Sequence, residues 1–155
     1  MIQSGADLTK LNEGCRYTAY RDNSPAGVWT IGYGHTGPEV KEGMIWTQKQ
    51  CEDQFAIDYD QACRYAANDL GQQEWGVLGD ERRAVLADIA FETGDSGLRK
   101  FKHLLAAVKA TQWDQAAAAL RNSLLFQQVP NRENRNIAIL LTGAWPQISS
   151  QPQES

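Results

Sequence analysis

The chain has 155 residues, of which 42% are hydrophobic, a composition that suits one domain with a substantial core. Its formal charge is −4, from 15 basic and 19 acidic side chains, which argues against the basic surface of a nucleic-acid-binding protein. No apolar run approaches a membrane span, so we expect no membrane insertion. The first residues also lack the cationic segment and apolar core of a signal peptide, so we expect export to need another protein.

The first element that we expect is a short helix ending near Gly14. Two leucines lie three positions apart in it, and Ser4 or Asp7 provides a side-chain oxygen to cap its start. Glu13 then falls in the last turn. Backbone carbonyls at a helix C-terminus carry partial negative charge, which disfavours an ionised carboxylate and helps Glu13 to stay protonated.

A hairpin is expected in the stretch from Glu13 to Thr36. Asp22 stands where a strand enters the turn N-S-P-A-G, and V-W-T-I-G-Y-G-H then alternates β-branched and aromatic residues with small ones. Glycosidic hydrolysis needs two acids, one to protonate the leaving oxygen and one to activate water or attack the sugar. Spacing alone favours a simpler interpretation, in which Glu13 is a solvated helix-end residue and Asp22 is a turn residue that bonds its own backbone.

The rest of the chain is expected to be helical. Thr47 and Gln50 match a capping box, and apolar residues then recur at helical intervals over residues 47–68. Three glycines within residues 70–79 are expected to break this pattern. Shorter helices are expected at residues 80–94, 98–110, 112–122 and 131–142. The fold class is therefore α+β and mainly α.

The three cysteines are expected to be reduced thiols. An odd number cannot all pair within one chain, and their spacing matches no metal site. Cys51 and Cys63 lie twelve residues apart on one expected helix, about 18 Å at the usual helical rise, which is too far for a disulfide. Cys15 has no neighbouring base in the sequence, so we expect a small packed side chain.

The sequence motifs around Glu13 and Asp22 resemble those of a known enzyme family. Glu13, eight residues, Asp22 and then T-I-G-Y-G-H-T are similar to the catalytic signature of the phage T4-type lysozymes, glycoside hydrolase family 24. The similarity continues through F-E-T-G, V-P-N-R-E-N-R and L-L-T-G-A-W-P. It implies a lysozyme-like, two-lobed fold in which a small β-hairpin lobe and a helical lobe are joined by a long helix, with the polysaccharide between the lobes.

The resemblance also implies the domain boundaries. We expect one catalytic domain over residues 1–146, with lobes at about 1–46 and 70–146 and the joining helix at about 47–68. Residues 147–155 are polar and are expected to form a flexible tail.

The resemblance assigns the catalytic roles. Glu13 is the general acid toward the glycosidic oxygen, and Asp22, helped by the Thr30 hydroxyl, holds the water that attacks the anomeric carbon. The two acidities must therefore be pushed apart. Seven residues separate Asp22 from Thr30, two more than the usual family spacing. A longer loop accommodates them at little cost, yet they leave open whether Asp22 keeps its place beside the water.

Three further residues are implied to contact the saccharide. Phe91 and Glu92 correspond to a cleft-facing phenylalanine and its polar neighbour, and Thr36 to another substrate contact. Sugar sites often combine an apolar platform with a few directed polar groups. By periodicity alone, Phe91 would be an ordinary core residue.

Three residues are implied to support the site structurally. His35 is expected to form an ion pair with Asp58 from the long helix, which adds stability while the histidine is protonated and makes a catalytic role for it unnecessary. Arg132 is expected to close on Glu13, although its position near a helix start also fits a solvated arginine.

The function implied is that of a peptidoglycan muramidase. It would hydrolyse the β-1,4 bond between N-acetylmuramic acid and N-acetylglucosamine with inversion, as a monomer without metal or organic cofactor. A phage endolysin released by a holin and an antibacterial effector with a secretion apparatus and an immunity protein are two settings for this chemistry. In both, the protein is made in the bacterial cytoplasm and acts on peptidoglycan in the periplasm or cell wall. A cell-wall-binding module that has lost catalysis is the alternative.

Overall fold

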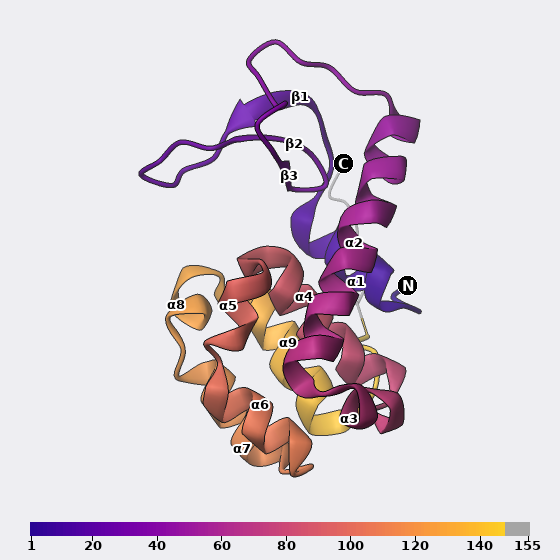
Figure 1. Ribbon diagram of the computed structural model, residues 1–155, viewed down its shortest axis with the longest axis vertical. Coiled ribbons are helices and arrows are strands. Elements are labelled where there is room, and N and C mark those ends of the chain that lie inside the picture. Colours follow the sequence, from indigo (N-terminus) through magenta and orange to yellow (C-terminus); the bar gives the residue numbers. More distant parts are fainter. Residues whose placement is uncertain (148–155) are drawn as a thin grey trace, which may run out of the picture.

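The computed structural model describes residues 1–147 and is mainly helical, with one small antiparallel sheet (Figure 1). The predicted α+β, mainly α class and two-lobed arrangement are confirmed. Of the tail predicted at 147–155, all but Gln147 lies outside the described residues. In chain order the elements are α1 Gly5–Glu13, β1 Arg16–Arg21, β2 Trp29–Gly32, β3 His35–Thr36, α2 Gln48–Leu70, α3 Gln72–Val77, α4 Asp80–Thr93, α5 Asp95–Arg99, α6 Lys102–Lys109, α7 Trp113–Arg121, α8 Leu124–Gln128 and α9 Pro130–Thr142.

The N-terminal lobe is built on a sheet with the order β1-β2-β3. Its small core consists of Ala19, Ile31 and Val40, covered by partly buried aromatic and methionine side chains. The predicted hairpin is present as β1 and β2, but β3 was not predicted. A strand of two residues is too short to show alternation in a sequence. It pairs with β2 because Gly32 and Gly34 turn the chain with positive φ angles of 65° and 71°.

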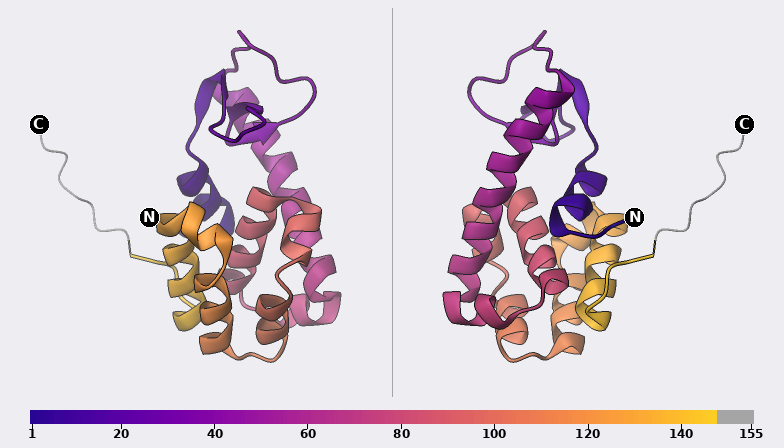
Figure 2. Two further views of the ribbon diagram at one scale, coloured as in Figure 1. Left: turned by 90° about the vertical axis from the view of Figure 1, so that its left-hand side faces the viewer. Right: turned by 90° about the vertical axis from the view of Figure 1, so that its right-hand side faces the viewer.

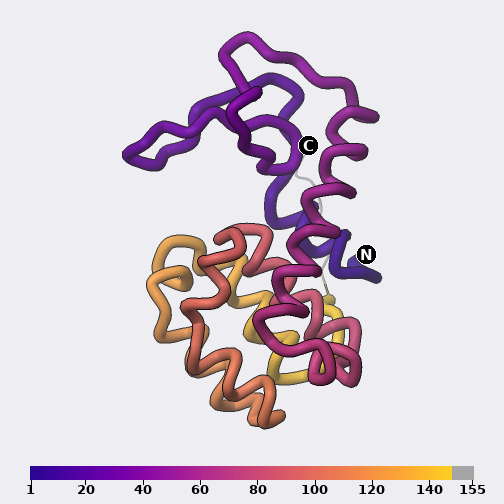
Figure 3. The backbone as a smooth tube through the Cα atoms, in the orientation of Figure 1, coloured from indigo at the N-terminus to yellow at the C-terminus, as the bar shows by residue number. Residues whose placement is uncertain are grey.

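The free edge of β1 is covered by the segment that leads from β3 to α2. The Ala19 N–H donates to the Met44 carbonyl at 2.9 Å, and the Trp46 N–H donates to the Tyr17 carbonyl at 2.8 Å. This segment loops over the outer end of the sheet before it enters α2, as the tube in Figure 3 shows. An unpaired strand edge would otherwise be exposed to other chains.

Helix α2 joins the two lobes and runs past the sheet and the helices (Figure 2). The predicted capping box is confirmed, since the Thr47 hydroxyl accepts from the Gln50 N–H and the Gln50 side chain accepts from the Thr47 N–H. The helix packs on β2 and β3 at one end and on α4, α5 and α6 at the other. Within residues 1–147, no helix is both long enough and apolar enough to cross a lipid bilayer.

The C-terminal lobe surrounds α4, whose buried face includes Val85, Leu86 and Ile89. The expected helix over 98–110 is wrong in detail, because Phe101 has non-helical backbone angles and separates α5 from α6. Helices α3 and α8 were also not predicted. Helices of five or six residues are marginal by propensity and form here by packing on the core, as Leu125 of α8 shows.

Candidate active site

Glu13 lies at the end of α1, where the lobes meet. Of the two caps that the sequence allowed, Ser4 starts this helix, and Gly14 ends it with a φ angle of 66°. The side chain of Glu13 is 18% exposed, and Arg132 Nη1 from α9 donates to its Oε1 at 2.6 Å. On the other side of the carboxyl stands Gly34, where an added β-carbon would overlap the Glu13 carboxylate. The carboxyl is thus held between the helical lobe and the β2–β3 turn.

The surroundings of Glu13 favour its protonated form. Burial is the largest influence and raises its pKa, while the charge and hydrogen bond of Arg132 lower it and the negative charge of Asp88 raises it again. The net direction is upward. A carboxyl group with a raised pKa keeps its proton at a pH where an ordinary glutamate has lost it, as a general acid must.

Arg132 is itself held by a buried carboxylate that the sequence did not reveal as part of the site. Its Nε donates to Asp88 Oδ2 and its Nη2 to Asp88 Oδ1, both at 2.9 Å. The arginine side chain is only 9% exposed, so the interpretation as a solvated arginine is wrong. The available signal was an acid inside the apolar run V-L-A-D-I-A-F of α4. Burial raises the pKa of Asp88, but the charge and hydrogen bonds of Arg132, with other donors, bring it below its usual value.

Glu92 faces this buried cluster and does not line the cavity beside Phe91. Its Oε2 lies 3.3 Å from Arg132 Nε, and burial outweighs the arginine charge and raises the pKa of Glu92 to about 8. Oxygens of Asp88, Glu92 and Glu133 lie within 4.8 Å of one another, and carboxylate oxygens are ligands that cations bind. Both Asp88 oxygens already accept from Arg132, however, so a guanidinium takes the place of a metal ion.

Asp22 follows β1 and organises the turn after it. Its Oδ1 accepts from the Ser24 N–H at 3.1 Å, the Ser24 hydroxyl and the Val28 N–H at 3.0 Å. The hydrogen bond from the Ser24 hydroxyl is the largest of several that lower the pKa of Asp22. The interpretation as a turn residue is therefore correct for Oδ1. Among the hydrogen bonds of the described residues, none goes to Oδ2, which leaves that oxygen for a water or a substrate.

Thr30 is buried in β2 and linked to the same turn. The Val28 carbonyl accepts from the Asp22 N–H at 3.0 Å and from the Thr30 hydroxyl at 3.2 Å. Tyr20 pairs with Thr30 in the sheet, and its pKa is raised by burial first and then by the negative charges of Glu13 and Asp22. Tyr20 therefore lies within the field of both acids. Sequence reasoning missed it, although its place two residues before Asp22 puts it on the same face of the strand.

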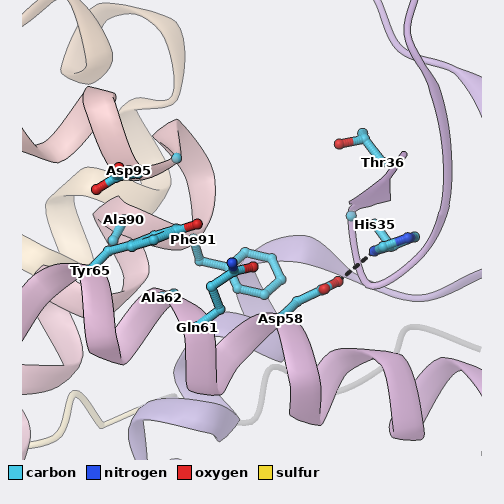
Figure 4. A pocket seen from close by; sticks show the side chains of 11 residues that line it. His35, Thr36, Asp58, Gln61, Ala62, Tyr65, Ala90, Phe91 and Asp95 are labelled. Carbon is cyan, nitrogen blue, oxygen red and sulfur yellow. Dashed lines mark hydrogen bonds and ion pairs between the residues drawn. The ribbon is translucent and has the colours of Figure 1, made fainter. Parts of the chain in front are cut away.

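A cavity of about 280 Å³ lies between the lobes next to Glu13. Figure 4 shows Thr36 on one side and Phe91, Gln61 and Tyr65 on the other. Gly34 lines this cavity and also contacts the Glu13 carboxyl, so the two sites adjoin. The structure thus brings Thr36 and Phe91 to one cavity. Gln61 and Tyr65 were missed, and their signal was helical spacing from Asp58 along one face of α2.

His35 bonds a carboxylate through each ring nitrogen. Its Nδ1 lies 2.7 Å from Asp58 Oδ2, and its Nε2 lies 2.7 Å from Glu39 Oε1 (Figure 4 shows the first pair). The hydrogen bond with Asp58 is the largest influence and raises the pKa of His35; burial opposes it and Glu39 adds to it. The ring has no free nitrogen for a substrate. Glu39 was missed, though it stands four residues after the histidine.

The chain is similar to known proteins over most of its length. The Phage lysozyme family profile matches residues 10–132. The chain is 28% identical over 166 residues to Probable T4-type lysozyme 2 of Dictyostelium discoideum, with 92% of this chain and 96% of that protein covered. It is also 28% identical to the Pre-baseplate central spike protein Gp5 of Enterobacteria phage T4, covering 90% of this chain and 28% of that protein. An Endolysin of Lactococcus phage c2 is 30% identical, with 79% of this chain and 54% of that protein covered.

The match spans the regions that build the site, from the end of α1 to the start of α9. Within it stand Glu13, Asp22 and Thr30 in the N-terminal lobe, and at its last residue stands Arg132, whose guanidinium reaches Glu13. The resemblance seen in the sequence is thus confirmed by comparison with whole proteins, and this chain belongs to the phage lysozyme family.

Proposed function

We propose that this glycoside hydrolase cleaves the β-1,4 bond between N-acetylmuramic acid and N-acetylglucosamine with Glu13 as general acid and Asp22 as general base. The observation that carries the proposal is the opposite tuning of two carboxyls. The pKa of buried Glu13 is raised, and the pKa of Asp22 is lowered. A pair of carboxyls tuned in opposite directions is the pattern of an acid and a base acting on one bond.

In the proposed reaction Glu13 gives its proton to the glycosidic oxygen as the bond from that oxygen to the anomeric carbon breaks. A water attacks the carbon from the opposite face and passes a proton to Asp22 Oδ2. The Thr30 oxygen retains lone pairs while its proton is donated to the Val28 carbonyl, so it accepts from the same water. Return of a proton from Asp22 to Glu13 through solvent closes the cycle. The configuration at the anomeric carbon inverts.

The lengthened turn is compatible with this role because it folds around the Asp22 carboxylate. Oδ1 is held by the turn and Oδ2 remains for the water. Inversion needs space for that water and carboxyl groups roughly 6.5–9.5 Å apart, whereas a retaining enzyme brings them closer. We therefore favour inversion.

The substrate contacts proposed are Thr36 and Phe91, which face each other across the cavity next to Glu13 (Figure 4). Glu92, which faces the buried cluster around Arg132 and does not line this cavity, is not proposed as a direct substrate contact. The pair of His35 and Asp58 has a structural role, as it fixes β3 against α2. The cavity offers an aromatic ring with polar groups around it, which suits a saccharide.

The biological setting that we favour is that of an endolysin acting on peptidoglycan as a monomer, with release by a holin. Support comes from the relative named Endolysin in Lactococcus phage c2. An antibacterial effector with a secretion apparatus and an immunity protein would use the same site. Gene neighbours decide between the two: a holin gene supports the first and an immunity gene the second.

The test combines wall clearing with product analysis. Purified peptidoglycan should lose turbidity when the protein is added, and a defined oligosaccharide should release the α anomer first, as read by NMR before mutarotation. A β anomer from the β bond would refute inversion and make Asp22 a candidate nucleophile. A folded protein that binds the wall without clearing it would refute the hydrolase and support the binding module.

A further inference from the structure

Asp88 is the centre of a buried polar cluster behind the proposed general acid. It lies on α4, is fully buried and does not line the cavity. In addition to Arg132, it accepts from the Thr9 hydroxyl at 2.7 Å, from Asn12 Nδ2 at 3.2 Å and from Asn136 Nδ2 at 3.0 Å. Two helices besides its own, α1 and α9, supply these donors. Both oxygens of this buried carboxylate are therefore fully hydrogen-bonded.

The guanidinium group of Arg132 forms hydrogen bonds with both Asp88 and Glu13. A guanidinium is planar, and its five N–H groups point in fixed directions. Because Asp88 takes Nε and Nη2, the plane and tilt of the group are set, and Nη1 is left aimed at Glu13 Oε1 at 2.6 Å. A lysine ammonium is a point charge, so a hydrogen bond to Asp88 would not fix the direction of a second hydrogen bond to Glu13.

We propose that Asp88 is a positioning residue for the reaction: it holds the guanidinium of Arg132 in a bidentate pair and thereby sets how tightly the proton is held on Glu13. The proposal rests on the proposed role of Glu13 as general acid. Asp88 acts in two ways. Its negative charge favours a proton on Glu13, and it takes up part of the positive charge of Arg132 that would otherwise act on Glu13 alone.

The other charged groups nearby do not replace Asp88. Glu92 on α4 and Glu133 on α9 share the cluster, and burial raises the pKa of both. Only Asp88 in this set has a lowered pKa, so it is the acid that stays ionised. From the remaining elements, Tyr20 of β1 feels the charge of Glu13, and Arg135 of α9 donates to Asn12 at 2.9 Å. The titratable groups that act on Glu13 or Arg132 are thus Asp88, Glu92, Glu133 and Tyr20.

The test is the Asp88→Asn variant. An amide keeps the shape but removes the anion, so Glu13 loses a neighbour that raised its pKa and gains a larger share of Arg132. The alkaline limb of the kcat/KM profile, which reports the free enzyme, should move to lower pH by about one unit, the usual effect of one nearby charge. KM at low pH should stay the same. The matched control is Ser4→Ala, which destabilises α1 by removing its cap but leaves the cluster intact, and its limb should not move.

The pKa of Glu13 should be read directly by NMR titration of its side-chain carboxyl carbon. In the natural protein this value should coincide with the alkaline limb; a mismatch there would overturn the role of Glu13 itself, not that of Asp88. In folded Asp88→Asn, the limb and the carboxyl value should fall together. An unmoved or raised carboxyl value in that variant would overturn the proposal while leaving the proposed function in place.

A second measurement covers the case in which Asp88→Asn does not fold. In the natural protein, NMR of arginine side chains should show a slowly exchanging Arg132 Nε–H and hindered rotation of its Nη groups. Arg121, which is exposed in the last turn of α7 and has no ion pair among the described residues, serves as the comparison. A guanidinium of Arg132 that rotates as freely as that of Arg121 would show that Asp88 does not position it.

Discussion

The two acids of the site are tuned by opposite means. Glu13 is enclosed by α1, α9 and the β2–β3 turn, and burial is the main reason why its pKa is raised. Asp22 stands in a surface turn, where donors from Ser24 and Val28 lower its pKa. Burial penalises a charge, whereas hydrogen bonds to a carboxylate stabilise it. The pKa of Glu13 therefore depends on distant segments of the chain, and that of Asp22 on seven consecutive residues, 22–28.

This difference indicates which substitutions should affect the general acid Glu13 and which should affect the general base Asp22. Changes far away in the sequence, on α4 or α9, act on the acid because they alter its enclosure and its charges. Changes within residues 22–28 act on the base because its donors all come from that turn.

Glu13→Gln should cause the largest loss. The amide fits the same space but has no acidic proton to donate, so clearing of purified wall should fall by about 10²–10⁴-fold. Circular dichroism should show a folded protein. The control is Glu42→Gln, an exposed glutamate outside the site, which should clear as the natural protein does. Near-normal clearing by folded Glu13→Gln would remove Glu13 from the reaction.

Asp22→Asn should cause the next largest loss, about 10²-fold, because an amide cannot take the proton of the attacking water. The turn should survive, since the amide oxygen still accepts from the Ser24 and Val28 N–H groups. Asp53→Asn on the exposed face of α2 is the matched control. Full activity of Asp22→Asn would mean that the two added residues have moved this side chain out of the reaction.

His35→Asn should affect stability more than turnover. The folded-state pKa of His35 is raised, so its pairs stabilise fully below the unfolded-state pKa of about 6.5 and less as pH rises through the folded-state value. At pH 6 the loss should be about 1–2 kcal/mol, or several degrees in Tm. The difference from the natural protein should shrink at higher pH. A folded variant of unchanged Tm but without turnover would make the histidine catalytic.

Ser24→Ala should have the smallest effect and tests the base alone. It removes the hydroxyl that lowers the pKa of Asp22 most, so the acidic limb of the kcat profile should move to higher pH. The alkaline limb, which follows Glu13, should stay in place. Movement of both limbs together would show that the two carboxyls are not tuned independently.

Much of the local structure was predictable because its causes lie close together in the sequence. The Ser4 cap, the capping box of Thr47 and Gln50, and Pro130 at the first turn of α9 each depend on a few neighbouring residues. Short elements were missed for the opposite reason. Strand β3 and helix α8 form through contacts with β2 and α9, which no local pattern displays.

The candidate site divides in the same way. The sequence by itself determined that Glu13 ends a helix and that Asp22 enters a turn, because capping and turn chemistry act over a few residues. Only the tertiary structure decided that Glu13 is enclosed and that Arg132, 119 residues later, reaches it. It alone decided that Asp88 holds that arginine, since an acid on a helix is read as solvated until its surroundings are known. Burial and charge are sums over all neighbours in space, and those neighbours come from separate helices.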